Sequence, residues 1–284
     1  MGIKIVTDST SYIPKELIKK YDITVVSLGI VMDGDGCKEV EICNDEFYRK
    51  LSQLENMPTS SQPTIEDLYS AFEKIIAEGN EAVGIFISSD MSGTYSTCNQ
   101  IVSTMIMEKY PNAKMEVLDS KSNCMQMGYA VIEAAKLAME GKDIEAVVEG
   151  AKNLMTRSRF LFVPDTLEYL KKGGRIGGAA ALFGTLLKIR PILTVEDGKT
   201  TVFDKVRTKQ KAIQKILNKI DEDIKNNELG ELIIHHINCE EEGKALADKV
   251  KEVFNIDAEI QCIGPVIGCH VGPKTVGIAY YTKR

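Results

Sequence analysis

Two hydroxyl-rich segments supply the residues of this chain that are best suited to chemistry. Residues 58–64 read Pro-Thr-Ser-Ser-Gln-Pro-Thr, and residues 88–95 read Ser-Ser-Asp-Met-Ser-Gly-Thr-Tyr. Each precedes a segment expected to be helical, so short O–H groups and free backbone N–H groups would meet there, which suits an oxyanion. Neither has a His, Lys or Cys directly beside it to turn a serine into a nucleophile. The pattern predicts a binding site rather than attack on a carbonyl.

Ser92 is the main candidate in the second segment. It follows an expected strand and begins an expected helix, at the edge where open α/β sheets bind ligands. Gly93 next to it would let a ligand approach the backbone closely. The alternative is that Ser92 only caps its helix. Ser60 and Ser61 in the first segment face the same choice.

Two glycine-rich segments add a histidine and an arginine. His270 lies in residues 264–273, expected to be a loop before the last strand, where its role is either structural or functional. Residues 173–178 read Gly-Gly-Arg-Ile-Gly-Gly, which matches neither a P-loop nor a dinucleotide-binding motif. We expect a mobile loop there, with Arg175 reaching toward a cleft or a partner.

Composition excludes several classes of function. The chain has 284 residues and a net charge of −6, and its basic residues are too scattered to predict nucleic-acid binding. No apolar run approaches the ~18 residues that span a bilayer. Seven cysteines, an odd number without C-x-x-C spacing, indicate neither a disulfide framework nor a metal site. The opening residues read as a strand rather than an apolar leader, so we expect a cytoplasmic protein.

The order of elements predicts two α/β domains, 1–157 and 158–284, with the ligand in a cleft between them. The first part predicts a parallel sheet, with strands over 3–6, 23–28, 82–87 and 114–118 and helices from Pro14 and over 44–51, 65–78, 93–109, 123–139 and 144–155. The second predicts an α+β domain with a mixed sheet, with strands over 159–163, 189–195, 200–206, 231–237, 258–262 and 276–281 and helices over 179–188, 209–226 and 240–253.

Several segments together resemble the DegV family, which includes the bacterial fatty-acid-binding proteins that serve fatty acid kinase. They keep the family's order over almost the whole chain: Val6–Ser11, Ser60–Thr64, Ser89–Tyr95, Leu118–Lys121, Lys172–Ile176, and Pro265–Ile267 with His270. Each segment alone is unspecific, but their combination is very specific.

The resemblance implies a two-domain protein that holds a long-chain fatty acid, of the palmitate, stearate or oleate type, with its carboxylate at the domain interface. A separate kinase protein would phosphorylate the carboxylate for phospholipid synthesis, so the chain would be a non-catalytic lipid carrier without a cofactor. By position, the carboxylate contacts fall on Ser60, Ser92 and His270, with Arg175 near the head group. Related proteins usually have Thr where Ser60 stands, and the neighbouring Thr59 leaves Ser61 as an alternative contact.

The resemblance also implies a tunnel wall and a partner surface. We expect residues 179–189 to form a wall or lid, and the tunnel lining to include Met91, Met105, Met125, Leu182, Phe183, Leu186, Leu187 and Ile267. Basic residues of the second half predict a face for the kinase or, transiently, an anionic membrane surface: Lys171, Lys172, Arg175, Lys188, Arg190, Lys205 and Arg207.

Two other functions remain open from the residues. The first is a serine-dependent hydrolase or acyltransferase with Ser92 as nucleophile and His270 as base. It lacks an evident acid to orient His270, and Ser-Gly-Thr-Tyr is not a nucleophile elbow. The second is a sensor of another small carboxylate, because the sequence does not fix the length of the ligand.

Overall fold

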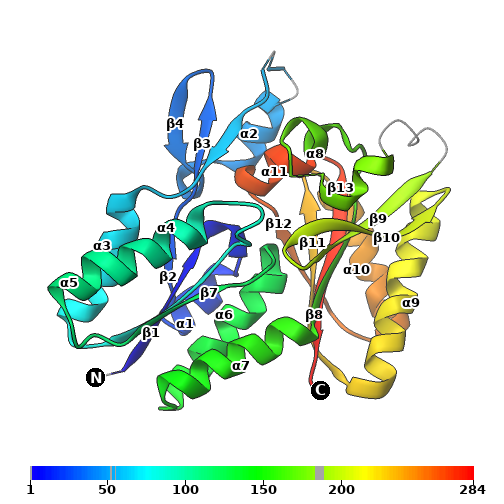
Figure 1. Ribbon diagram of the computed structural model, residues 1–284. Coiled ribbons are helices and arrows are strands. Elements are labelled where there is room, and N and C mark those ends of the chain that lie inside the picture. The colour runs from blue at the N-terminus through cyan, green and yellow to red at the C-terminus, as the bar shows by residue number, and fades with distance from the viewer. Residues whose placement is uncertain (1, 52, 55, 183–188) are drawn as a thin grey trace.

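The first domain is built on a four-stranded parallel sheet, as the alternation of strands and helices predicts (Figure 1). The computed structural model describes residues 2–51, 53–54, 56–182 and 189–284. The strands follow the order β2-β1-β6-β7, with β1 Ile3–Asp8, β2 Thr24–Val26, β6 Glu81–Phe86 and β7 Met115–Asp119. Because neighbouring strands are parallel, the polar segments after β1, β6 and β7 all leave the same edge of the sheet.

Helices cover both faces of this sheet. On one face lie α3 Ile65–Ala77 and α4 Thr94–Ile101, and on the other lies α6 Cys124–Met139, backed by α7 Ile144–Arg157. Residues 64–67 read Thr-Ile-Glu-Asp, a variant of the capping box, and Thr64 caps α3. Its Oγ1 accepts a hydrogen bond from the backbone N–H of Asp67 at 3.0 Å and donates one to the Asp67 carboxylate at 2.9 Å.

A small antiparallel sheet stands above the carboxyl edge of the parallel sheet, in the order β4-β3-β5 (Figure 1). Its strands are β3 Gly29–Met32, β4 Asp35–Lys38 and β5 Thr59–Ser61. The remaining helices of this part of the chain are the 3-10 turns Ser9–Ser11 and Glu39–Glu41, α1 Lys15–Lys20 and α2 Asn44–Leu51. The segment around Ser60, expected to be a turn, is therefore a strand paired with β3.

The second domain has a six-stranded mixed sheet, in the order β10-β9-β8-β13-β11-β12. Its strands are β8 Ser158–Val163, β9 Arg190–Glu196, β10 Lys199–Val206, β11 Leu229–Ile237, β12 Glu259–Cys262 and β13 Thr275–Thr282. Within the described residues, its strands pair in antiparallel fashion except β11 with β12. One face is covered by α9 Lys209–Asn227 and α10 Glu240–Phe254.

The other face of the mixed sheet packs on α6, which contacts β1 and β6 of the first sheet and β8 and β13 of the second (Figure 1). One apolar core therefore continues from the first sheet through α6 into the second.

The domain boundary at 157/158 stays a prediction; it falls where α7 ends and β8 begins. Within the described ranges, no helix has both the length and the apolar character needed to cross a bilayer. All seven cysteines are free thiols.

Two predicted helices differ from what the structure shows. The helix expected over 93–109 is interrupted, because a π-helical turn Val102–Ile106 separates α4 from α5 Met107–Lys109. Thr104 and Ser103 donate hydroxyl hydrogen bonds to the carbonyl of Gln100 at 2.7 and 3.2 Å, and such bonds compete with the regular ladder. In place of the helix expected over 179–188, the structure has a 3-10 helix Gly177–Leu182, after α8 Glu168–Lys172; residues 183–188 lie outside the described part.

The loop expected around His270 is also wrong, because residues Pro265–Val271 form helix α11. The glycines and prolines of residues 264–273 favoured a loop, but Pro265, Gly268 and Gly272 are each compatible with the helix. Pro265 occupies the first turn, where its missing N–H costs nothing. Gly268 leaves room for the hydroxyl of Tyr48, which would lie 1.9 Å from an added Cβ. Gly272 ends the helix with φ at 91°.

Candidate functional site

Ser60 and His270 meet although 210 positions separate them in the chain. Strand β5 presents Ser60 and helix α11 presents His270, and the Ser60 Oγ lies 2.7 Å from the His270 Nε2. The contact joins the small sheet of the first domain to a helix of the second. Two of the three residues predicted to bind a carboxylate are thus brought together.

The imidazole of His270 is held against the glycine segment. An added Cβ on Gly173 would lie 2.2 Å from the His270 Nδ1, so only glycine leaves space for the ring. This Nδ1 is buried and makes no hydrogen bond within the described residues. Burial, followed by the positive charge of Arg175, lowers the pKa of His270 to about 4. The ring is therefore neutral at pH 7, with one N–H to donate.

Ser60, Ser92, Arg175 and His270 all line one enclosed cavity of about 30 Å³. Its other lining residues are mostly apolar: Leu28, Ile87, Met91, Asn123, Leu170, Thr200, Val266, Ile267 and Val271. A few polar groups that converge within an apolar wall are typical of ligand sites. The four predicted head-group residues come from β5, the loop after β6, the glycine segment and α11.

Ser92 and Arg175 are held at the cavity by local hydrogen bonds. The Ser92 Oγ lies 2.8 Å from the Thr94 Oγ1 and accepts from the Thr94 backbone N–H at 3.3 Å. Gly93, not Ser92, is the N-cap residue of α4. Arg175 is exposed; its guanidinium donates to the carbonyls of Met91 at 3.2 Å and Gly173 at 2.8 Å. Its positive charge therefore stands beside the cavity rather than inside it.

Two predicted residues are not among those that line this cavity. Ser61 is exposed, and its Oγ fills the space beside Gly29, where an added Cβ would lie 2.5 Å away. Gly93 faces the side chain of Gln62, whose Oε1 would lie 2.4 Å from an added Cβ. Gln62 therefore occupies the side on which a side chain of residue 93 would project, and access of a ligand to the Gly93 backbone stays a prediction.

A second, apolar cavity of about 20 Å³ adjoins the first, because Asn123, Thr200, Ile267 and Val271 line both. Its remaining lining lies deeper in the second sheet: Phe160, Phe162, Val195, Ile237, Ile263 and Thr275. The polar groups of the candidate site therefore lie at the first cavity, and the adjoining cavity lies deeper in the apolar core.

Only part of the predicted tunnel lining can be located at these cavities. Met91 and Ile267 line them, whereas Met125 and Leu182 are buried without lining either one. Met105 is 44% exposed on the π-helical turn, so its predicted place in a tunnel is wrong. Phe183, Leu186 and Leu187 lie outside the described residues, as does Lys188 of the predicted basic face.

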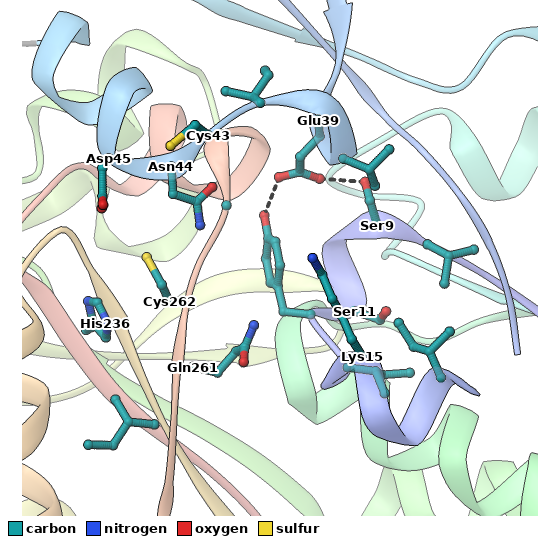
Figure 2. A pocket seen from close by; sticks show the side chains of 18 of the residues that line it. Ser9, Ser11, Lys15, Glu39, Cys43, Asn44, Asp45, His236, Gln261 and Cys262 are labelled. Carbon is teal, nitrogen blue, oxygen red and sulfur yellow. Dashed lines mark hydrogen bonds between the residues drawn. The ribbon is translucent and has the colours of Figure 1, made fainter. Parts of the chain in front are cut away.

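A wider groove of about 590 Å³ is lined by residues of both domains, among them Ser9, Glu39 and His236, and none of the predicted site residues lines it (Figure 2). Glu39 is buried at its wall, where it accepts hydrogen bonds from Ser9 at 2.5 Å and Tyr12 at 2.7 Å. It also accepts one at 2.8 Å from the backbone N–H of Val266, in the first turn of α11. Burial raises the pKa of Glu39. The Val6–Ser11 segment thus helps to hold the helix that carries His270.

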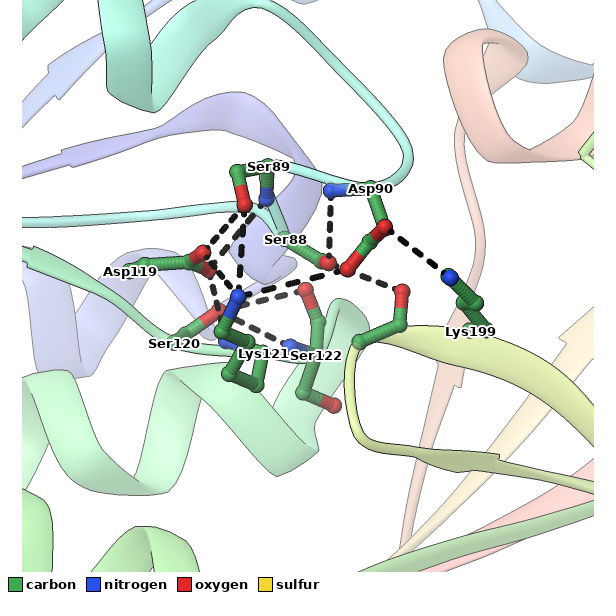
Figure 3. A network of polar contacts seen from close by, with 9 residues as sticks. Ser88, Ser89, Asp90, Asp119, Ser120, Lys121, Ser122 and Lys199 are labelled. Atoms are coloured by element: carbon green, nitrogen blue, oxygen red, sulfur yellow. Dashed lines mark hydrogen bonds and ion pairs between the residues drawn. The ribbon is translucent and has the colours of Figure 1, made fainter.

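A polar network ties the carboxyl edge of the first sheet to the β9–β10 hairpin (Figure 3). The Ser88 hydroxyl donates to the carbonyl of Gly198 at 2.8 Å, and the Asp90 carboxylate pairs with Lys199 at 3.4 Å. The next residue of the hairpin, Thr200, lines both cavities. These contacts therefore fix one wall of the site.

Sequence reasoning missed Asn123 and Thr200 as lining residues. Asn123 follows the Leu118–Lys121 segment and begins the helix expected over 123–139, so its sequence position gave no sign of a lining role; in the structure it is the N-cap residue of α6. Thr200 looked like a hairpin residue because its neighbours give the signal for a turn. Only the packing of the two domains brings them to one place.

Comparison with known proteins gives consistent results over the full length of the chain. The sequence pattern described as "Uncharacterised protein, DegV family" matches residues 2–283. A DegV domain-containing protein of Clostridium acetobutylicum is 54% identical over 284 residues, covering 100% of this chain and 99% of that protein.

Solved structures with the same fold include two that are described by the lipid they bind. A DegV family protein from Thermus thermophilus, described for its fatty acid binding, has a TM-score of 0.90 and 30% identity, covering 99% of this chain and 100% of that one. A stearic acid-binding protein from Eubacterium ventriosum has a TM-score of 0.88 and 27% identity, covering 99% and 98%.

Proposed function

This chain belongs to the DegV family, and from that membership we propose that it binds a long-chain fatty acid, with the carboxylate held by Ser60, Ser92 and His270. The observation that carries the proposal is the shared cavity: the three side chains line one pocket with a mostly apolar wall, and a second, apolar cavity adjoins it. A buried carboxylate is tolerated only with several hydrogen-bond donors, and two hydroxyls with a neutral imidazole N–H supply three. Solved relatives described as binding fatty acids support the same ligand class.

The apolar tail supplies most of the binding free energy in this proposal. Burial at ~0.8 kcal/mol per methylene gives roughly 10 kcal/mol for a sixteen-carbon acid, before the costs of ordering the chain. The two cavities of about 30 and 20 Å³ are much smaller than the ~300 Å³ or more of common ligand pockets. Binding must therefore move their apolar walls apart, and the flexible Met91 is suited to such a change.

We extend the proposal to a carrier that is not catalytic by itself and acts in the cytoplasm. A separate fatty acid kinase would transfer the γ-phosphoryl group of ATP to a carboxylate oxygen, giving an acyl phosphate and ADP. The exposed Lys171, Lys172, Arg175, Lys205 and Arg207 supply a face for that kinase or, transiently, for an anionic membrane surface. Arg190, which also belongs to the predicted face, is half-buried and pairs with Asp165 at 3.3 Å.

Mass spectrometry of the purified protein tests the ligand. The protein is prepared without added lipid, its organic extract is analysed, and its native mass is measured in parallel. One fatty acid per chain is the expected result, and its length and unsaturation give the preference. A protein that is empty and takes up neither palmitate nor oleate contradicts the proposal and favours a sensor of another small carboxylate.

A separate assay tests the carrier role. The loaded protein is mixed with the catalytic protein of a bacterial fatty acid kinase and ATP, and acyl phosphate is trapped with hydroxylamine. Hydroxamate is expected only when both proteins are present. The Ser92→Ala and His270→Ala proteins should lose both affinity and trapped product; full retention of both would contradict the assigned roles.

One observation favours a second candidate, a serine-dependent acyl hydrolase or transferase. The Ser60 Oγ and the His270 Nε2 lie at the distance of a nucleophile and its base, although it is Ser60 rather than the expected Ser92 that makes this contact. Against it, the Nδ1 of His270 has no acid to orient it in the described chain, and a pKa of about 4 makes the imidazole a weak base. Hydrolysis of p-nitrophenyl palmitate that disappears in Ser60→Ala would establish this activity.

A further inference from the structure

Asn123 stands at the junction of the polar and the apolar cavity. It lines both of them, and it is 7% exposed. The head-group residues lie in the first cavity and the aromatic rings of Phe160 and Phe162 line the second. A fatty acid whose carboxylate occupies the first cavity therefore passes Asn123 with its first few carbons.

The side chain of Asn123 does not cap α6, although Asn123 occupies the N-cap position. Asparagine is among the preferred N-cap residues, yet this one makes no capping hydrogen bond to α6. Its Nδ2 donates instead to the sulfur of Met91 at 3.3 Å, a weak acceptor. Met91 is itself a lining residue of the first cavity. The amide is thus turned toward the cavity rather than toward the helix.

The Oδ1 of Asn123 is buried and has no hydrogen-bond partner among the described residues. A buried polar atom without a partner is costly, and an unbranched alkyl chain beside it would leave that cost in place. A hydroxyl group on the ligand would remove this cost by forming a hydrogen bond with the amide of Asn123. Because a hydroxyl both donates and accepts, it satisfies the amide in either orientation of its oxygen and nitrogen.

We infer that this protein prefers long-chain acids that carry a hydroxyl group close to the carboxylate, on the second or third carbon, and that Asn123 recognises this hydroxyl. The inference rests on the proposed fatty-acid function and names a narrower class of ligand for the same site. A site built to hydrogen-bond a ligand hydroxyl discriminates against the analogue without it, because the polar group of the site is then left unpaired. The expected preference is about tenfold in Kd.

The test compares palmitic acid with 2-hydroxypalmitic and 3-hydroxypalmitic acid, each hydroxy acid as separate enantiomers. Affinities are measured by competition against a fluorescent fatty acid, for the wild type, Asn123→Leu and the matched control Asn112→Leu. Asn112 is exposed and lines neither of the two cavities. Leucine replaces the amide with an apolar group of similar size. A second variant, Asn123→Ala, is used if the first fails to fold.

In the wild type and in Asn112→Leu, one hydroxy acid should bind about tenfold more tightly than palmitic acid. In Asn123→Leu the ratio should fall to about one. Equal affinities in the wild type, or a preference that persists in the Asn123 variants, would overturn the inference. So would an Asn123 variant that weakens all acids equally, because Asn123 would then contact the carboxylate. Failure of every acid to bind the wild type would instead reject the fatty-acid function.

Discussion

The Oγ of Ser60 lies 2.7 Å from the Nε2 of His270, and this contact joins a strand of the first domain to a helix of the second. The Ser60 hydroxyl is the hydrogen-bond partner of the His270 Nε2. The other ring nitrogen, Nδ1, is buried and has no partner within the described residues. The pair therefore fixes the direction of the ring and holds the Ser60 hydroxyl and the imidazole at the same end of the cavity.

Replacing Ser60 by alanine should weaken palmitate binding about tenfold, because one donor is lost and His270 loses its partner. Ser61→Ala is the matched control: Ser61 is the next residue of β5, its side chain is exposed, and it does not line the cavity. Isothermal titration with palmitate measures both. Equal losses in the two variants would show that the strand matters and not the Ser60 hydroxyl.

Gly173→Ala should displace the imidazole of His270, because the new Cβ would lie 2.2 Å from its Nδ1. Overpacking of this kind costs about 1–3 kcal/mol, so we expect palmitate affinity to fall at least tenfold. Gly178→Ala provides the control in the same glycine segment, since its Cβ would meet nothing closer than 3.8 Å. Unchanged affinity in Gly173→Ala would mean that His270 is free to move without affecting the ligand.

Glu39→Gln should weaken the attachment of α11, although Glu39 does not line the cavity. Its carboxylate accepts hydrogen bonds from Ser9, Tyr12 and the Val266 N–H, and an amide nitrogen placed among these donors leaves at least one unpaired. We expect a loss of about 2 kcal/mol in the free energy of unfolding, with weaker palmitate binding. Glu41→Gln, at an exposed position of the same 3-10 helix, should change stability by less than about 0.5 kcal/mol. Urea unfolding measures both; equal stability of the two variants would contradict the prediction.

The hairpin contacts predict an effect on the rate of ligand exchange. Ser88→Ala removes the hydrogen bond to Gly198, beside the lining residue Thr200, so fatty acid should dissociate several-fold faster. Ser120→Ala is a matched control: it is also buried, but its hydroxyl bonds to Ser122 within its own loop. Stopped-flow displacement of a fluorescent fatty acid measures the rates. Similar rates in the two variants would show that the hairpin does not control exchange.

The sequence predicts most elements of the fold, because their signals are local. The capping pattern at Thr64 and the alternation of strands and helices both hold in the structure. Local signals failed where tertiary packing decides. Pro265–Val271 forms a buried helix despite two glycines at its ends, and Thr59–Ser61 is a strand only because β3 pairs with it.

The candidate site is predictable in part for the same reason. Family resemblance points to Ser60, Ser92, Arg175 and His270, which the structure brings to one cavity. Asn123 and Glu39 carry no local sign of a role there. Asn123 resembles a helix cap, and Glu39 acts through Val266, which follows it by 227 positions in the chain. Contacts over such separations depend on how the domains pack.

The lowered pKa of His270 predicts an acid-sensitive stability. Burial and the charge of Arg175 bring the pKa from 6.5 to about 4 in the folded protein, so between these values the unfolded chain binds a proton that the folded chain does not. The free energy of unfolding should therefore fall as the pH falls from 6.5 to 4, with about 2–3 kcal/mol coming from this residue. His270→Gln should remove that share, while the buried His235, whose pKa is also lowered to about 4, contributes equally in both proteins. Urea unfolding at pH 7, 5.5 and 4.5 measures the difference; parallel pH curves for the wild type and His270→Gln would show that the imidazole is protonated as readily in the folded protein as in the unfolded chain.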